Sequence, residues 1–194
     1  MQRLVLLQLI KFRSIKNIMT TEHKVIGGIG LLTIIIIVGG IWFSSKEGAR
    51  NQEKLSKAMM GEKMTDEGAG HVSRDETHVA YKSNPPTSGP HWVGVAGAGI
   101  KDEIVPDELV LHSMEHGAAV VWYKEGLGQN EIGKITEAFN SASGKKIMLA
   151  RKDLDVPVAL TSWGYLLKLQ TIDEVKIKEF IEINNDRAPE RAPI

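Results

Sequence analysis

The chain has 194 residues, of which 42% are hydrophobic, and this allows one domain of ordinary size together with an additional segment. Its 24 basic residues balance its 24 acidic residues, and its four tryptophans do not alternate with basic clusters, so we expect no binding to nucleic acid. The lack of cysteine excludes disulfides, thiolate metal sites and thiol nucleophiles, and it leaves His, Met, Asp and Glu as side chains that can bind a metal.

Residues 25–43 predict one N-terminal transmembrane helix. This run has no charge, is long enough to cross the hydrocarbon layer, and ends with Trp42 and Phe43, which suit the membrane interface. A soluble core helix of this length would carry a polar face. A cleaved signal peptide would have a shorter apolar core and a small-residue cleavage site. We therefore expect an uncleaved anchor.

Residues 1–24 are predicted to be a basic cytoplasmic leader. Met19 directly precedes a conventional leader sequence, so translation can start at Met1 or at Met19. Basic residues flank residues 25–43 on both sides, and the small asymmetry between them favours an inside N-terminus and an extracytoplasmic C-terminal domain.

Residues 44–70 are predicted to be a stalk or linker, because most of them are polar and good helix formers. Met59, Met60 and Met64 can be either packing residues or a soft copper-binding tract. A glycine-rich passage then marks the expected start of the folded domain, which covers residues 71–190 and is followed by a short tail, residues 191–194.

The first part of this domain is expected to be a strand at residues 77–81, followed by a proline-rich loop. Three prolines and a glycine in residues 84–92 stiffen that loop, so it can hold His91 and Trp92 in fixed positions, although a simple surface turn explains the same residues. Residues 93–99 are small and glycine-rich, which is typical of a flexible flap or of a close backbone approach.

The densest chemical motif is HSMEHG, which contains His112, Glu115 and His116. In a helix these three side chains share one face. In a strand the two histidines lie about 13 Å apart, which is too far to hold one ion. Asp107 as N-cap and Gly117 as a left-handed C-terminal residue favour a short helix.

Hydrophobic periodicity predicts the remaining elements. The expected strands are residues 118–123, 146–150, 157–163 and 165–169, and the expected helices are residues 130–141 and 173–185. This order predicts an α+β domain with a small mixed sheet and flanking helices.

Four motifs in this order resemble a family of uncharacterised bacterial proteins that carry a domain of unknown function on an N-terminal membrane anchor. The motifs are Tyr81 with NPPTSGPHW, LHSMEHG followed by VVWY, PVALTSWG, and the last helix with its end at Arg187 and Pro189-Glu190. The resemblance covers His71 to Glu190 and implies a bacterial cell membrane, a single span and this domain extent. The family pattern has a leucine-like residue at Met114, which argues against Met114 as a ligand.

The first functional hypothesis is a metal site. His112 and His116 would be ligands on one helical face, His91 and His71 would complete the site, and Glu115 would be a ligand or would orient an imidazole. An imidazole-rich and thiol-free set of this kind suits copper or zinc. Alternatively, these histidines are ordinary buried residues that backbone hydrogen bonds satisfy.

Two further functions stay open. In a zinc-dependent hydrolase with the HxxEH pattern, Glu115 would be the general base, and Glu182 and Glu190 would be candidate third ligands; otherwise no catalytic residue is assigned. In a non-catalytic interaction module, tryptophans would form a surface for a cell-envelope partner, although core packing explains them as well. They are Trp92, Trp122 and Trp163. Residues 88–91 also admit a thioredoxin-like fold, which would lack thiols.

Overall fold

The computed structural model describes residues 21–190 and 192–194, so residues 1–20 of the predicted leader, with the alternative start at Met19, and one residue of the tail lie outside the described residues. The chain forms two compact units, residues 1–53 and residues 54–194.

The first unit contains most of the long helix α2 (Thr21–Ser56). Its apolar side chains are exposed all around, as Ile26 (68%) and Ile36 (64%) illustrate. An all-round apolar helix needs a protein core or a lipid environment. This helix is long and apolar enough to cross a membrane, as residues 25–43 predicted.

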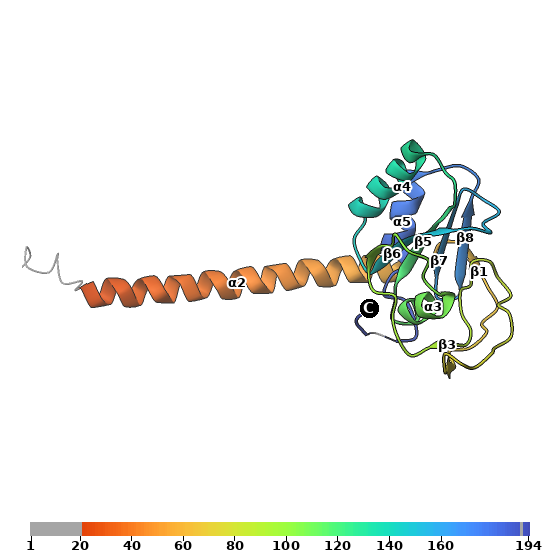
Figure 1. The fold of residues 1–194 in the computed structure, drawn as a ribbon. Coiled ribbons are helices and arrows are strands. Elements are labelled where there is room, and N and C mark those ends of the chain that lie inside the picture. Colours follow the sequence, from red (N-terminus) through yellow and green to blue (C-terminus); the bar gives the residue numbers. More distant parts are fainter. Residues whose placement is uncertain (1–20, 191) are drawn as a thin grey trace, which may run out of the picture. The chain divides into compact units, whose positions relative to one another are not determined.

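The second unit is built on a six-stranded mixed sheet with the order β1-β8-β7-β5-β6-β4 (Figure 1). The strands are β1 (Glu62–Lys63), β4 (Gly99–Ile100), β5 (Ala119–Lys124), β6 (Lys146–Arg151), β7 (Val158–Ser162) and β8 (Tyr165–Leu169). β5 pairs in parallel with β6 and antiparallel with β7, and β7 and β8 form a hairpin. A separate two-stranded parallel sheet joins β2 (His71–Val72) to β3 (His91–Trp92).

Helices cover both faces of the large sheet because its central strands alternate apolar side chains toward both sides. α4 (Gln129–Ser141) and α5 (Glu174–Asn184) pack with Val121 into one core cluster. α3 (Asp107–Glu115) packs with Val120 and Trp122 into the other. The α+β class with a mixed sheet and flanking helices is thus confirmed.

The packed unit begins earlier than the expected boundary at residue 71. β1 pairs with β8, and Met60 donates from its N–H to Asn184 Oδ1 and accepts from Asn184 Nδ2, both at 2.9 Å. Met60 packs against one core cluster and Met64 packs against the other. These contacts favour the packing role of the two methionines over the copper-binding alternative. A two-residue strand is too short to show periodicity, so the polar sequence of this segment does not reveal β1.

Three local predictions differ from the structure. Residues 77–81 form no strand: His78 bonds locally to the Val79 carbonyl, and Val79 is 85% exposed. Pro106 occupies the N-cap, while Asp107 is the first helical residue and pairs with Arg151 instead. The apolar spacing within residues 173–185 also predicts Val175 on the buried face of the last helix, but this side chain is 66% exposed.

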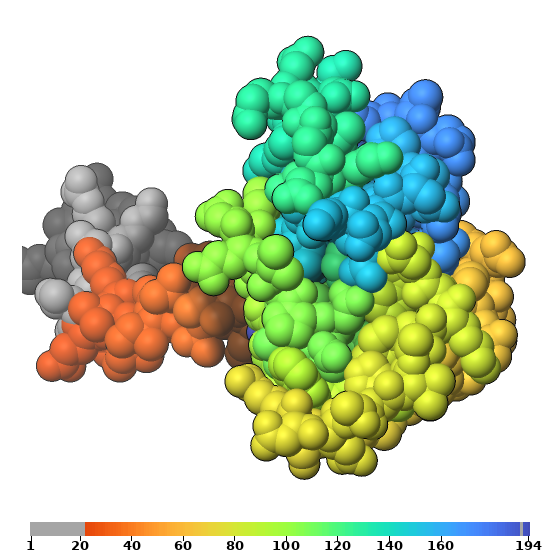
Figure 2. Space-filling view, turned by 45° about the vertical axis from the view of Figure 1, so that its right-hand side comes forward, coloured from red at the N-terminus to blue at the C-terminus, as the bar shows by residue number. Residues whose placement is uncertain are grey.

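The segment between β2 and α3 lies over α3, and Figure 2 shows it, in yellow to light green, as a broad part of the surface of this unit. Ala96 N–H donates to Leu109 O (3.2 Å) and to Ser113 Oγ (2.8 Å), both on α3. A Cβ on Gly94 would lie 3.3 Å from Leu109 Cδ2. The backbone of residues 93–99 therefore approaches α3 closely, which is one of the two roles that their small side chains predicted.

Candidate metal centre

Helix α3 places the histidines of the HSMEHG motif on one side. The helix ends at Glu115, and the C-cap residue His116 still donates its backbone N–H to His112 O (3.1 Å), so the two side chains are helical neighbours. Gly117 follows with φ +96°, a left-handed conformation that ends the helix. The helical reading of this motif is therefore correct.

The pair β2 and β3 brings two more histidines to the helix. His71 and His91 are direct partners in this parallel pair. Backbone bonds from Gly89 N–H to Gly68 O (2.8 Å) and from His91 N–H to Gly70 O (3.0 Å) hold the two segments together. Residues twenty positions apart in the sequence thus present their imidazoles side by side.

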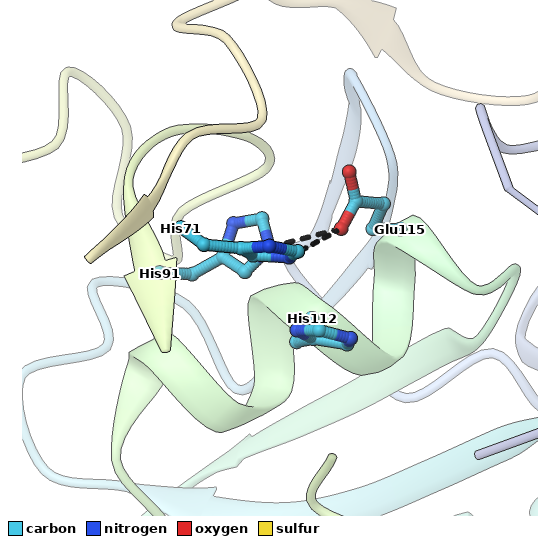
Figure 3. Close-up of side chains that lie close together, drawn as sticks. All are labelled: His71, His91, His112 and Glu115. Atoms are coloured by element: carbon cyan, nitrogen blue, oxygen red, sulfur yellow. Dashed lines mark hydrogen bonds and ion pairs between the residues drawn. The ribbon is translucent and has the colours of Figure 1, made fainter. Parts of the chain in front are cut away.

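Four side chains converge from these elements (Figure 3). Glu115 Oε2 lies 2.9 Å from His91 Nε2 and 3.5 Å from His71 Nε2. The His71 ring stacks on the His112 ring, with centroids 4.8 Å apart. One donor atom from each of the four residues lies within 4.8 Å of the others. His91 is fully buried, His112 and Glu115 nearly so, and His71 is half-exposed.

Backbone carbonyls determine which nitrogen of three histidines carries the proton. A carbonyl oxygen only accepts hydrogen bonds, so a Nδ1 that contacts one must donate, and in a neutral imidazole Nε2 then keeps a free lone pair. The three contacts are His91 Nδ1 to Gly89 O (2.8 Å), His112 Nδ1 to Trp92 O (2.8 Å) and His116 Nδ1 to Pro193 O (2.9 Å). Metal-binding histidines commonly have this arrangement, because the second hydrogen bond fixes ring orientation and tautomer.

The free nitrogens face groups that also carry lone pairs. His91 Nε2 faces the Glu115 carboxyl at 2.9 Å, and His112 Nε2 faces His116 Nε2 at 3.1 Å. Each contact needs a positive species between its two atoms, either a proton or a metal ion. Burial lowers the pKa of His112, the Trp92 carbonyl partly offsets this, and the neighbouring imidazoles lower the pKa further. His112 therefore resists taking up the proton.

His116 lies beside this group but not in it. It forms a second group with Glu115 and Glu190, and its Nε2 lies 3.4 Å from Glu190 Oε2. Sequence reasoning named Glu190 only as a candidate ligand of a hydrolase, and it missed the carbonyls that fix the tautomers. A loop conformation sets those carbonyl positions, and no residue pattern reports them.

Other candidate residues have different roles. Met114 is fully buried and its sulfur accepts a hydrogen bond from Thr161 Oγ1 (3.2 Å), so it is a core residue. Trp122 is buried and donates from Nε1 to Thr161 Oγ1 (2.8 Å), which fits core packing rather than a partner surface. Glu182 accepts from Ser143 N–H on the opposite side of the sheet from α3.

Residues 71–193, more than half of the chain, match the model of a family described as "Protein of unknown function (DUF3105)". The chain belongs to this family. The matched range starts at His71 and contains all six residues of the two donor groups. No curated protein and no solved structure gives a significant match, so the thioredoxin-like alternative gains no support from them.

Proposed function

We propose that this member of the DUF3105 family is a single-pass protein of the bacterial cell membrane whose extracytoplasmic domain binds copper or zinc. The ligands are His71, His91, His112 and Glu115. The observation that carries this proposal is the 2.9 Å contact of His91 Nε2 with the Glu115 carboxylate in a buried site, where His91 Nδ1 already donates to the Gly89 carbonyl. A buried set of this kind is costly unless a cation neutralises it.

Two of the distances between donor atoms lie close to those expected for ligands of one ion. Two ligands at about 2.0–2.1 Å from a zinc ion lie about 2.9–3.4 Å apart at angles between 90° and 109°. The distances from Glu115 Oε2 are 2.9 Å to His91 Nε2 and 3.5 Å to His71 Nε2. Three imidazoles and one carboxylate, without a thiolate, suit zinc and copper(II).

The same contacts bear on the hydrolase alternative. A general base in the HxxEH pattern needs a carboxylate that is free to take a proton from water. Glu115 Oε2 instead contacts His91 and His71, which favours Glu115 as a ligand. Two open surface grooves of about 470 and 530 Å³ run along β8, and neither is lined by a residue of the donor groups. Binding of a cell-envelope partner by this domain stays a prediction.

Metal analysis of the full chain tests the site. The protein is purified in detergent with a tag that contains no histidine, loaded with Zn²⁺ or Cu²⁺, desalted and analysed for bound metal. We expect bound metal in the wild type and loss of it in His91→Gln and in the half-exposed His71→Gln. The control His78→Gln removes a histidine that pairs with Glu108 outside the site (3.1 Å) and should bind as the wild type does.

Near-ultraviolet circular dichroism of the aromatic side chains, which include the buried Trp122, checks that each variant is folded. A wild type without bound metal, or a folded His71→Gln variant with wild-type metal affinity, would refute the site.

Reporter fusions at the C-terminus test the location: we expect an extracytoplasmic reporter to be active and a cytoplasmic one to be silent. The opposite pattern would show that the orientation is wrong.

A further inference from the structure

The C-terminal segment adds donors beside the first group. Glu115, His116 and Glu190 each offer one ligand atom, and these atoms lie within 4.8 Å of one another. His116 Nε2 lies 3.4 Å from Glu190 Oε2 and 3.1 Å from His112 Nε2. Since the Nδ1 of His116 donates to a carbonyl, Nε2 of the neutral imidazole has a lone pair that faces this carboxylate and this second imidazole.

The segment that carries Glu190 is held in place from several sides. Glu190 N–H donates to Glu115 O (3.1 Å), and Asp186 N–H donates to Gly117 O (2.8 Å). Lys145 Nζ donates to His116 O (2.9 Å) and to Ala192 O (2.8 Å) and pairs with Asp186 (2.9 Å). Glu190 is itself 54% exposed at its side chain, so the backbone, not burial, positions it next to His116.

We propose that the domain holds two cations that share the Glu115 carboxylate, the second one bound by His116 and Glu190. This inference rests on the proposed function, because it assumes that the first group binds a metal. Glu115 belongs to both donor groups, and a carboxylate has two oxygens that can serve two ions. Sites with two metal ions place them about 3.5–4 Å apart.

The two positions differ in their donors and in exposure. The first has three imidazoles and one carboxylate and is mostly buried. The second has one imidazole and two carboxylates, one of them half-exposed, so it is richer in oxygen. Oxygen ligands suit harder ions and water-filled coordination. We therefore expect the second ion to bind more weakly, to exchange with solvent, and to leave coordination positions for water or an anionic ligand.

A zinc titration of the full chain in detergent tests the second position. We expect two equivalents of Zn²⁺ in the wild type, a tight one and a weaker one, and only the tight one in Glu190→Gln and His116→Gln. Glu108→Gln is the matched control, because it breaks a histidine–glutamate pair of similar length outside the site (3.1 Å) and should keep both equivalents. Anomalous diffraction from zinc-loaded crystals should show two peaks about 3.5–4 Å apart.

The outcomes separate the two proposals. One equivalent in the wild type, unchanged in Glu190→Gln and His116→Gln, overturns the second position and leaves the first intact. Loss of all metal in His116→Gln overturns the second position too, because His116 then serves the first ion. Two equivalents that survive in Glu190→Gln and His116→Gln place the second ion elsewhere and also overturn it. No equivalent in the wild type refutes the proposed function itself.

Discussion

Replacing Gly117 by alanine should weaken both the fold and the second cation position. Gly117 has φ +96°, a region in which an L-residue costs about 1–2 kcal/mol. An added Cβ would lie 2.9 Å from Asp186 Cα and 3.1 Å from Asp186 N. Because these are backbone atoms, the segment must shift, and the bond from Asp186 N–H to Gly117 O (2.8 Å), worth about 0.5–1.5 kcal/mol, weakens.

The matched control is Gly126→Ala. Gly126 has a similar φ of +87°, but nothing lies within 4 Å of an added Cβ. It therefore carries the same backbone cost of about 1–2 kcal/mol without the contact. We expect Gly117→Ala to lose about 1.5–3.5 kcal/mol in total, and a domain of this size loses roughly 2–4 °C in Tm for each kcal/mol.

The assay is thermal unfolding of the full chain in detergent, followed by tryptophan fluorescence with a chelator present so that no metal contributes. The metal titration is then repeated on both folded variants. We expect Gly117→Ala to lose the weaker equivalent of zinc and Gly126→Ala to keep it. Equal Tm losses in the two variants would refute the reasoning about the Asp186 contact.

Two further predictions concern the periphery of the domain. The hydrogen bond from His78 Nδ1 to the Val79 carbonyl raises the pKa of His78 above its ordinary value of 6.5, and the Glu108 carboxylate raises it further. Protonated His78 therefore stabilises the fold below pH 6.5, and this stabilisation is lost as the pH rises through the folded pKa. We expect His78→Gln to lower the urea-unfolding free energy by about 0.5 kcal/mol at pH 5.5 and less at pH 8.5; a larger loss at pH 8.5 would contradict this. A chain that starts at residue 71 lacks β1 and leaves the buried Asn184 amide without its backbone partner, which should cost about 1–3 kcal/mol against a chain that starts at residue 54. Equal urea midpoints of the two shortened chains would show that residues 54–70 are only a linker.

The elements with regular periodicity could be predicted from the sequence, and the short ones could not. Strands such as residues 119–124 and helices such as residues 129–141 differ from their expected bounds by one residue, because their apolar spacing reflects burial directly. β1, β2 and β3 have two residues each, so no alternation can reveal them. The false strand at residues 77–81 shows the converse: β-branched and aromatic residues occurred there without a partner strand.

The candidate site shows the same division between local and distant information. The helical relation of His112 to His116 depends on spacing within one helix and could be predicted. The approach of His71 to His91 depends on a parallel pairing between two loops, and the position of Glu190 depends on how the C-terminus returns to α3. The sequence therefore shows which residues can bind a metal, but the distances between those residues depend on the fold.

Helix α3 should stay in place without metal, because its position does not depend on the ligands. The same nine residues bury Leu111 and Met114 completely against the sheet while His112 and Glu115 face the loops. Burying two such side chains contributes about 3–6 kcal/mol. Small metal-dependent domains, in contrast, unfold when the metal is removed, because they have little other core. We expect the chelated protein to keep the near-ultraviolet circular dichroism signal of its packed aromatic side chains and a cooperative unfolding transition, with only a lower Tm than the metal-loaded form. Loss of that signal on chelation would mean that the metal, not the apolar face, holds the helix, and the site would then be structural rather than preformed.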